Sequence, residues 1–401
     1  MRIAYFTDTF LPQVNGIATS LANQAKYLGD HGHKVLIFTP KLDDIPRKKF
    51  QAKNVKVVNL PAVPSLIYTE FKFGVFGLPQ VIKHLTEFKP DIIHLHSNFT
   101  VAMDALMAKK IFKKPLVGTI HVYFAENDYL KFIKFRLAVK ILGKFAKRYL
   151  DFLYNQCDLL LTPSKILIEE LRNKGYKKEV YYQPNGIDLN HPKFLSAKQK
   201  DDLKKRYGLK EKVILHFGRL SYEKSIDVLI KAFDPLIHHQ NVSLLIIGHG
   251  PATKSLIRLT KKLGLEKSVV FTGFIDHQAL ISSGLLSIGD LFATASPMEV
   301  SPMVVLEAMA FGLPIVGVEA AGMVELVSDN GYLVKKGSIR ELTEKMEKIL
   351  FDKAIASQMS KNSLNAVKEY SIAKTTSHLL KLYQSLLKHS SALSDNITLS
   401  V

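Results

Sequence analysis

Short apolar runs recur along the first half of the chain, separated by longer amphipathic stretches. Such runs, with little alternation of polar residues, are typical of strands buried on both faces of a parallel sheet. We expect strands at residues 2–8, 34–40, 55–61, 91–97, 115–121 and 158–164, and a first helix at residues 19–31. Strand alternating with helix predicts a doubly wound parallel sheet, in which ligands bind beyond the carboxyl ends of the strands.

The same pattern restarts after a polar segment. Pro184, Asn185 and Gly186 followed by polar residues 190–210 indicate a domain boundary. Further strands are expected at residues 212–220, 242–250, 269–274, 291–295 and 314–319, a helix at 225–236, and largely helical structure at 338–387. The chain is therefore divided into α/β domains at residues 1–188 and 189–370, a final helix at 371–388 and a disordered tail at 389–401.

Two carboxylates, Glu299 and Glu307, flank a turn in the second half of the chain. Pro302 suits the first turn of a helix that Gly312 stops, so Glu299 lies in a loop and Glu307 inside the helix. Free N–H groups at a helix start suit a ligand rich in oxygen, and carboxylates accept hydrogen bonds from hydroxyls. The pair fits a nucleotide sugar, although an isolated pair of this kind is more often a solvated loop Glu and a surface ion pair.

Two other loops carry groups suited to phosphate. Arg219 and Lys224 follow the first strand of the second domain, where Arg binds phosphate in a forked geometry and Lys as a mobile point charge. Gly16 follows the first strand of the chain, where a missing side chain lets a ligand approach the backbone and the helix start favours negative charge. Taken alone, the Gly16 loop is more often a simple strand-to-helix turn, and cations in a loop are ordinarily just solvated.

Histidine ends one of the expected strands. The imidazole of His121 can donate to a sugar hydroxyl or share charge with a phosphate, although a lone histidine there more often only caps the next loop. His94 and His96 share one face of a strand, and without an evident third ligand they are interpreted as structural. The only cysteine, Cys157, lies in an apolar run and is expected in the core.

The charge is the unusual feature of the composition. With 401 residues, 47% of them hydrophobic, the chain can bury two cores, but its net charge is +19, of which +12 lies in residues 1–190 as 28 Lys and Arg against 16 Asp and Glu. Such a surface attracts nucleic acid or an anionic membrane. An acid at Asp8 is too early for a secretory signal and no run of about 18 uncharged apolar residues occurs, so a cytoplasmic location is expected.

Residues 131–150 contain seven basic residues and no acid. On a helical wheel the basic residues that gather on one side are Arg136, Lys140, Lys144, Lys147 and Arg148, and the apolar residues opposite are Phe132, Phe135, Val139, Leu142, Phe145 and Tyr149. A helix on an anionic bilayer has this pattern, with about 1 kcal/mol from each basic residue. A solvated basic face whose apolar stripe packs on the domain explains it equally well. Nucleic acid is not expected, because no binding motif accompanies the charge.

The string E-A-M-A-F-G-L-P at residues 307–314, with Glu299 before it, resembles the E-x7-E signature of the retaining glycosyltransferases of family 4. T-D-T-F-L-P-Q-V-N-G at residues 7–16, P-N-G-I-D at 184–188 and G-R-L-S-Y-E-K at 218–224 resemble further motifs of this family, in the expected order, and His121 matches a functional histidine. Ser225 departs from the family pattern, which usually has Gly after this Lys. The resemblance covers residues 2–386.

This resemblance implies the GT-B fold, in which two facing Rossmann-like domains hold the acceptor and the nucleoside diphosphate sugar, and the last helix returns to the first domain. It implies transfer of a hexosyl unit with retention of configuration. The residues implied in donor binding are Gly16, Arg219, Lys224, Glu299, Ser301, Pro302, Met303 and Glu307, and those implied in catalysis are His121, Glu299, Arg219 and Lys224. Glu307 would hold the ribose, Glu299 the transferred sugar, and the two cations the diphosphate.

The acceptor is suggested by residues 121–129, H-V-Y-F-A-E-N-D-Y, which are similar to the H-T-x-Y-E-x-Y region of diacylglycerol glucosyltransferases. We therefore expect transfer of glucose from a UDP-sugar to a lipid such as diacylglycerol at the inner membrane surface, with no cofactor, and no metal because no D-x-D pair occurs. A phosphatidylinositol mannosyltransferase and a soluble transferase with a sugar acceptor are alternatives. A non-catalytic protein that binds nucleotide sugars or RNA is an alternative of a different class.

Overall fold

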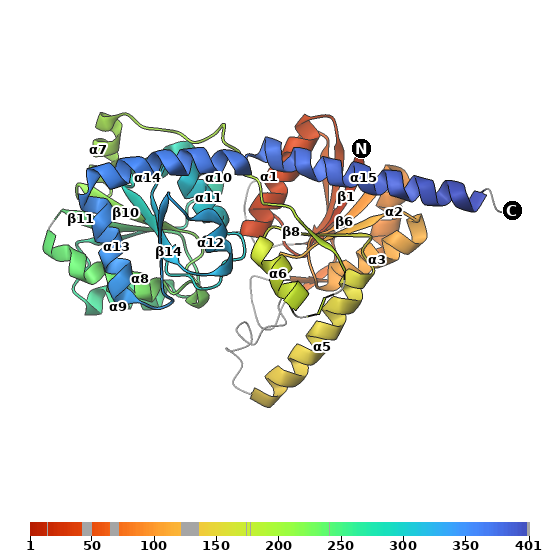
Figure 1. Ribbon diagram of the computed structural model, residues 1–401, viewed down its shortest axis with the longest axis horizontal. Coiled ribbons are helices and arrows are strands. Elements are labelled where there is room, and N and C mark those ends of the chain that lie inside the picture. The colour runs from red at the N-terminus through yellow and green to blue at the C-terminus, as the bar shows by residue number, and fades with distance from the viewer. Residues whose placement is uncertain are drawn as a thin grey trace. The chain divides into compact units, whose positions relative to one another are not determined.

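The computed structural model describes residues 1–398 except residues 14, 42–49, 65–71, 122–135, 174, 177 and 240, and leaves out the side chains of residues 136–144, 321 and 389–398. The chain forms two compact units, which are residues 1–186 with 373–401 (unit 1) and residues 187–372 (unit 2). Their limits lie within two residues of those expected. Each unit is a sheet flanked by helices (Figure 1).

The main sheet of unit 1 is parallel, with the strand order β3-β2-β1-β6-β7-β8-β9. Its strands are β1 (Arg2–Phe6), β2 (Lys34–Pro40), β3 (Val55–Leu60), β6 (Ile92–Leu95), β7 (Leu116–Thr119), β8 (Leu159–Thr162) and β9 (Val180–Tyr182), beside a hairpin of β4 (Ala62–Pro64) and β5 (Lys72–Gly74). The chain runs outward in both directions from β1 and β6, so the loops after these strands lie at the topological switch point, where doubly wound sheets bind ligands.

The helices of unit 1 are α1 (Gly16–Asp30), α2 (Leu78–Phe88), α3 (Thr100–Phe112), α5 (Arg136–Asn155), α6 (Lys165–Asn173) and α15 (Ile372–Thr398). The last of these returns from unit 2 and places Leu379 and Tyr383, both fully buried, in a core cluster with Ile3 and Tyr5 of β1. The disordered tail predicted at residues 389–401 was wrong for 389–398, which continue α15. No Gly or Pro interrupts the sequence 372–398, so nothing local stops the helix after its apolar stripe ends.

Unit 2 has a second parallel sheet, in the order β12-β11-β10-β13-β14-β15, with its switch point between β10 and β13. The strands are β10 (Lys212–Phe217), β11 (Val242–Ile247), β12 (Val269–Gly273), β13 (Leu291–Ala293), β14 (Ile315–Val318) and β15 (Gly331–Val334). The helices are α7 (Ala197–Arg206), α8 (Ile226–Phe233), α9 (Thr253–Lys262), α10 (His277–Ser283), α11 (Met303–Ala310), α12 (Ala321–Leu326), α13 (Ile339–Phe351) and α14 (Lys353–Ala366), with 3-10 turns η1 (Tyr222–Lys224), η2 (Asp234–His239), η3 (Leu285–Ile288) and η4 (Val367–Tyr370).

Strand β10 shows why the strands could be predicted from apolar runs in the sequence. Val213 and Leu215 enter a core cluster with residues of α11, whereas Ile214 between them enters a separate cluster with residues of α8 and α13. Because successive side chains of a strand point to opposite faces, covering both faces requires a continuous apolar run. This arrangement confirms the predicted doubly wound α/β class.

Several elements differ from the expectation. Strand β15 and the β4–β5 hairpin were not predicted, and the expected strands generally extended beyond the observed ones into the following loops. Helix α8 ends at Phe233, before the expected residue 236, and the chain continues as η2, which contains Pro235, a residue without a backbone N–H. Among the described residues, no helix combines the length and the apolar character that crossing a bilayer requires.

Candidate active site

In unit 2 the loops at the switch point bring two predicted site residues together. Lys224 ends η1, after β10, and Glu299 lies in the loop between β13 and α11. The Nζ atom of Lys224 is 2.7 Å from Oε1 of Glu299, and the two side chains are 29% and 10% exposed. The backbone carbonyl of Glu299 also accepts a hydrogen bond from Gly322 N at 2.6 Å. The cationic and the acidic loop therefore form one site.

Glu307 lies inside α11 as predicted and is 5% exposed. Its Oε1 atom is 2.8 Å from Nε2 of His277, the first residue of α10. Burial opposes a charge on His277, but the charge and the hydrogen bond of Glu307 outweigh it, so the pKa of His277 is raised. The sequence analysis missed His277, although the reasoning that selected His121, a histidine just beyond a strand, applied to it as well.

The start of α11 carries three further residues that were predicted to bind the donor, Ser301, Pro302 and Met303. Pro302 is the N-cap residue and not part of the first turn, and Met303 is the first helical residue. Because the first N–H groups of a helix have no intrahelical acceptor, this end of α11 offers donors to an oxygen-rich ligand. Ser301 precedes it and is half-buried, and Gly312 adopts φ 70° just beyond the helix, as expected for a helix stop.

The loop after β10, which was predicted to bind phosphate, depends on close backbone contacts. Gly248 adopts φ 140°, and a Cβ atom there would lie 1.9 Å from the carbonyl oxygen of Gly218. The Gly248 turn therefore packs against the loop that carries half-buried Arg219. Ser225, which departs from the family pattern, takes a left-handed conformation with φ 49°. The loop thus keeps a backbone path that suits glycine while holding a residue with a side chain.

In unit 1 the first-loop motif is held by its own polar side chains. Gly16 opens α1 and is exposed, and Oδ1 of the N-cap residue Asn15 accepts a hydrogen bond from Ala18 N at 2.9 Å. Nδ2 of Asn15 donates to Oγ1 of Thr9 at 2.6 Å, and this hydroxyl in turn donates to Gln13 Oε1 at 2.5 Å. The start of α1 is therefore fixed, with Gly16 open to solvent.

His121 follows β7 and belongs to a buried cluster of histidines. Its Nε2 atom is 3.4 Å from Nδ1 of His96, while His94 contacts Thr119 Oγ1 at 2.7 Å and the Tyr383 hydroxyl at 2.5 Å. Burial lowers the pKa of His121 to about 4, so the imidazole is neutral near pH 7. It can exchange hydrogen bonds with hydroxyls but carries no charge to share with a phosphate.

His96, interpreted from the sequence as structural, has one feature that a structural role does not explain. Within the described part of the chain, its buried Nε2 atom has no hydrogen-bond partner. It borders a cavity of about 10 Å³, far smaller than a hexose, on which His121, His94 and Asn185 also lie. Because its buried nitrogen lacks a hydrogen-bond partner and it lies beside the predicted catalytic His121, His96 is a candidate site residue.

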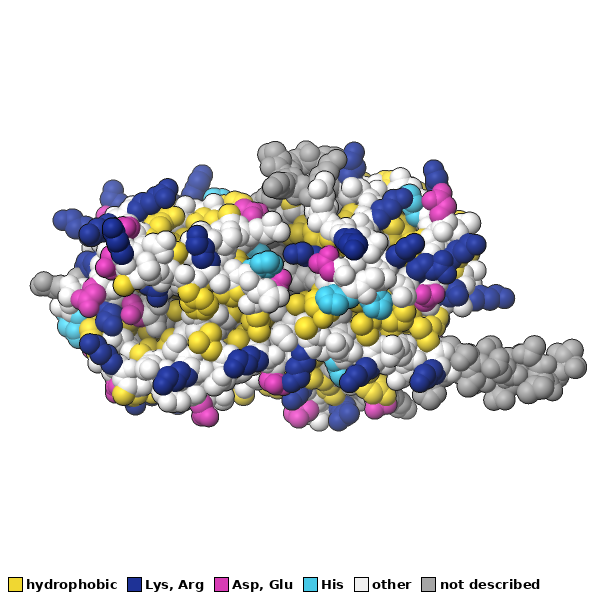
Figure 2. Space-filling view, turned by 90° about the horizontal axis from the view of Figure 1, so that it is seen from above, with side chains coloured by type: hydrophobic (Ala, Val, Ile, Leu, Met, Phe, Trp, Pro, Cys, Tyr) yellow, Lys and Arg dark blue, Asp and Glu magenta, His cyan; other side chains and the backbone are white. Residues whose placement is uncertain are grey.

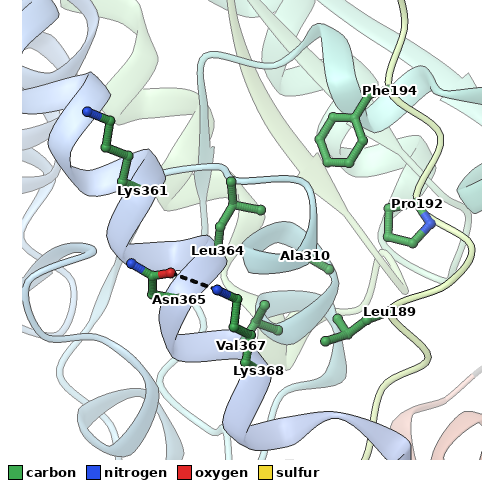
Figure 3. Close-up of a pocket in the computed structure, with 9 residues that line it drawn as sticks. All are labelled: Leu189, Pro192, Phe194, Ala310, Lys361, Leu364, Asn365, Val367 and Lys368. Carbon is green, nitrogen blue, oxygen red and sulfur yellow. Dashed lines mark hydrogen bonds between the residues drawn. The ribbon is translucent and has the colours of Figure 1, made fainter.

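A larger cavity of about 520 Å³ lies elsewhere in unit 2, at the carboxyl end of α11 and against α14 (Figure 3). Its lining residues are Leu189, Pro192, Phe194, Ala310, Lys361, Leu364, Asn365, Val367 and Lys368. Lys368 Nζ donates to Asn365 Oδ1 at 3.0 Å. None of the predicted donor or catalytic residues lines this cavity, which therefore does not bear on the site.

Helix α5 contains the predicted membrane-binding residues. Lys147 and Arg148 are exposed, while the side chains of Arg136, Lys140 and Lys144 lie outside the described residues, as do Phe132 and Phe135 altogether. Phe145, expected on the apolar stripe, is 65% exposed, whereas Tyr149 donates its hydroxyl to the Phe99 carbonyl at 3.0 Å. The stripe is therefore not wholly packed on the domain. On the face drawn in Figure 2, Lys and Arg side chains are spread over both units.

Comparison with known proteins agrees with this architecture. A model described as Glycosyltransferase Family 4 matches residues 14–191, and one described as Glycosyl transferases group 1 matches residues 198–366. The chain is 29% identical to alpha-monoglucosyldiacylglycerol synthase of Streptococcus pneumoniae, over 83% of this chain and 74% of that protein. It is 27% identical to GDP-mannose-dependent alpha-mannosyltransferase of Corynebacterium glutamicum, over 100% of this chain and 92% of that protein.

Solved structures share the fold. Anabaena HepE in complex with UDP has a TM-score of 0.74 at 22% identity, covering 96% of this chain and 100% of that one. Sucrose-phosphate synthase of Thermosynechococcus elongatus has a TM-score of 0.79 at 20% identity, covering 97% and 99%. The fold is that of the GT-B glycosyltransferases. The chain belongs to glycosyltransferase family 4.

Proposed function

We propose that this enzyme transfers glucose from UDP-glucose to a lipid acceptor such as diacylglycerol at the inner face of the membrane, with retention of configuration and with no metal on the phosphates. The observation that carries the proposal is the Lys224–Glu299 pair beside the start of α11. A cation suited to phosphate and a carboxylate suited to hydroxyls are hydrogen-bonded to each other. A sugar diphosphate carries both groups that such a pair can bind.

In the proposed reaction, the bond between the sugar C1 and the diphosphate oxygen breaks, and a bond from C1 to the acceptor hydroxyl oxygen forms. The hydroxyl proton passes to the departing diphosphate. Lys224 and Arg219 stabilise the charge on that group, and one such cation contributes about 3–4 kcal/mol to transition-state stabilisation. Glu299, freed from Lys224 when the diphosphate arrives, accepts hydrogen bonds from the hydroxyls of the transferred sugar.

Glu307 would hold the ribose. His277 occupies its Oε1 atom, so the other carboxylate oxygen accepts from a ribose hydroxyl. The backbone N–H groups at Met303 and Gly16 would each approach a phosphate or sugar oxygen. His121, neutral near pH 7, would bond a sugar hydroxyl as a donor or an acceptor. These roles need no charge on the imidazole.

The lipid acceptor is supported by two findings of different kinds. Relatives from Streptococcus pneumoniae and Acholeplasma laidlawii are named alpha-monoglucosyldiacylglycerol synthases. Helix α5 exposes Lys147, Arg148 and Phe145 together, and this combination of basic and aromatic side chains suits the surface of an anionic bilayer. UDP-glucose is favoured because structures of the same fold are described in complex with UDP and UDP-glucose.

A second donor has its own support. GDP-mannose-dependent mannosyltransferases are among the relatives, and one of them aligns with the whole chain. The alternative is therefore transfer of mannose from GDP-mannose to a phosphatidylinositol-type lipid. A thermal-shift screen of sugar nucleotides separates the two donors, because only the bound donor stabilises the folded protein in proportion to its affinity.

The test is turnover by the full chain with UDP-glucose and vesicles that contain diacylglycerol and an anionic lipid. We expect glucosyl lipid with the anomeric configuration of the donor. Lys224→Met should lower kcat by about 10²–10³-fold. The control Lys231→Met removes a lysine that pairs with Asp227 on α8 at 2.9 Å and should keep full activity. Transfer only to soluble sugars, or from GDP-mannose alone, would refute the proposed acceptor or the proposed donor, respectively.

A further inference from the structure

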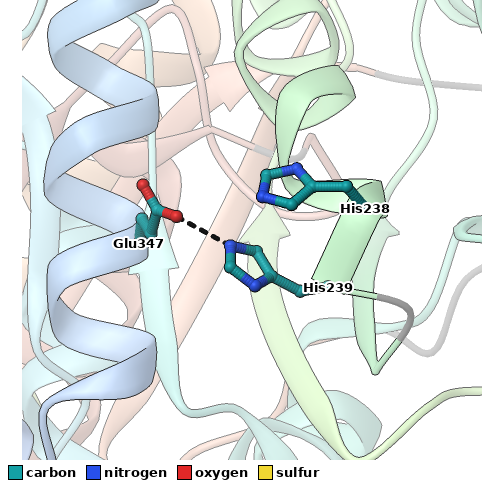
Figure 4. Close-up of side chains that lie close together, drawn as sticks. All are labelled: His238, His239 and Glu347. Carbon is teal, nitrogen blue, oxygen red and sulfur yellow. Dashed lines mark hydrogen bonds and ion pairs between the residues drawn. The ribbon is translucent and has the colours of Figure 1, made fainter.

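We propose that unit 2 carries a zinc site formed by His238, His239 and Glu347. Each residue offers one ligand atom, and the three atoms lie within 4.8 Å of one another. Figure 4 shows both imidazole rings turned towards the carboxylate. Two imidazoles and one carboxylate form a ligand set that zinc prefers, with a fourth position available for water.

The cluster lies away from the donor loops of unit 2. His238 and His239 end η2, which leads through Asn241 into the amino end of β11, and Glu347 lies on α13. The donor loops follow the carboxyl ends of β10 and β13, which run parallel to β11. The two groups of residues therefore lie at opposite ends of the strands of one sheet, and the zinc site is separate from the proposed donor site.

The ligand atoms can reach the spacing of a tetrahedral zinc centre through movements of their side chains. Zinc binds these ligands at about 2.0–2.2 Å, so neighbouring ligand atoms are separated by roughly 3.4 Å. His239 Nε2 and Glu347 Oε1 are 2.7 Å apart and share a hydrogen bond. His238 is exposed, so rotation of its side chain can bring the third atom into range. Zinc would take the place of the proton between His239 Nε2 and Glu347 Oε1, and the His239 imidazole would carry its proton on Nδ1.

The surroundings orient the rings for this purpose. Nδ1 of His238 contacts the Pro235 carbonyl, which leaves Nε2 for the metal, as is usual for metal-bound histidine. The His239 ring packs on Phe351 with ring centroids 4.3 Å apart. Lys348 is next to Glu347 in the sequence. Its Nζ atom lies 5.5 Å from the centre of the Tyr332 ring, in a cation–π contact.

Zinc in this position would join η2 to α13, which are 108 residues apart at His239 and Glu347. Helix α13 also covers the core cluster that includes α8, the helix before η2. Because the unfolded chain does not hold these ligands together, zinc binds the folded form preferentially and stabilises unit 2. The inference does not depend on which donor or acceptor the enzyme uses.

The experiment is isothermal titration of the full chain, purified without a histidine tag, with zinc chloride, together with thermal unfolding. We expect one zinc per chain and a higher Tm with zinc. Glu347→Gln and His238→Gln should each weaken binding by at least about tenfold. The control His191→Ala should bind as the unaltered protein does, because His191 lies 3.1 Å from Asp188 but belongs to no such three-residue group among the described residues.

Two results would overturn the proposal. One is the absence of saturable zinc binding, and the other is an unchanged affinity in both Glu347→Gln and His238→Gln. His239→Ala is less informative alone, because it also removes the ring that packs on Phe351. His238 is exposed, but its ring lies 4.0 Å from that of His239, so the metal-free Tm of its variant is measured as the reference. A loss of the zinc-dependent rise above that Tm then reports on the ligand itself.

Discussion

Individual side chains in this enzyme depend on partners far away in the sequence. Glu307 and His277 are 30 positions apart, and each changes what the other can do. The imidazole is partly buried, which alone would favour its neutral form, and the carboxylate reverses that preference. The pair gives the ribose side of the proposed site a carboxylate whose direction is fixed before the donor arrives.

The His277 pair leads to a prediction on pH. Because the pKa of His277 is raised above the 6.5 of the unfolded chain, the pair stabilises the fold fully below about pH 6.5 and loses this contribution as the pH rises through the folded pKa. In an NMR titration, Glu307→Gln should lower the pKa of His277, because burial then dominates. The exposed control Glu266→Gln should leave it in place. An identical titration in Glu307→Gln would contradict the assignment.

Ser225 gives a prediction on backbone strain. A left-handed conformation costs a residue with a side chain about 1–2 kcal/mol, while glycine loses about 0.5–1 kcal/mol more chain entropy on folding. Ser225→Gly should therefore leave the free energy of unfolding equal or raise it by up to about 1 kcal/mol. Ser225→Val should lower it by about 1–2 kcal/mol, because a β-branched residue resists φ 49°. Chemical denaturation of both variants measures the difference, and a less stable glycine variant would contradict the argument.

Helix α5 is amphipathic, but it does not bury its whole apolar side. Its last turns pack through Leu150, Leu153 and Tyr154, which are buried, while Phe145 and Phe152 are 65% and 50% exposed. Aromatic side chains in water beside exposed Lys147 are costly unless another surface covers them. The helix is therefore the element on which membrane binding is best tested.

Charge reversal on α5 should weaken membrane binding. Each basic residue near an anionic bilayer contributes about 1 kcal/mol, so Lys147→Glu with Arg148→Glu should lower the affinity for anionic vesicles by about 30-fold or more. Lys261→Glu with Lys262→Glu on α9 makes the same change in net charge on two exposed residues and should have a smaller effect. Vesicle flotation at low salt measures both. Equal losses in the two double variants would show that α5 has no special role.

In the molecule as a whole, unit 2 is one continuous segment, whereas unit 1 is completed by the end of the chain. Leu379 and Tyr383 of α15 are fully buried in unit 1, and the Tyr383 hydroxyl contacts His94, 289 positions earlier. Losing one large buried side chain costs about 2–5 kcal/mol, so losing both costs about as much as a domain's entire stability.

Two truncations test this dependence. Removing residues 373–401 should abolish the cooperative unfolding of unit 1 in calorimetry and keep a transition for unit 2, because unit 2 contains its own core clusters. Removing residues 389–401 keeps Leu379 and Tyr383, so it should leave both transitions close to those of the full chain. Unit 1 unfolding normally without residues 373–401 would show that α15 is not part of its core.

The fold could largely be read from the sequence because its signals are local. A strand buried on both faces must be apolar throughout, so β2 and β10 were recognisable from their composition alone. Strand β15 begins with Gly331 and is only half-buried at its centre, and the strands of the β4–β5 hairpin contain Pro64 and Lys72 and are mostly not buried. None of the three therefore has the apolar run that marks a strand buried on both faces. The last residues of α15 were not predicted as helix because the apolar stripe ends before them. The end of an apolar stripe shows where a helix stops packing on the domain, but its backbone hydrogen bonds can continue further.

By itself the sequence predicted which loops would carry the chemistry and which of their residues suit phosphate and sugar, because turn residues and helix starts have local sequence signals. Tertiary structure alone decided the partners. It set Lys224 against Glu299, 75 positions away, and His277 against Glu307, and it placed Tyr383 of α15 beside His94. Contacts between residues so far apart in the sequence depend on the order of the strands in each sheet. No local pattern of hydrophobic residues encodes that order.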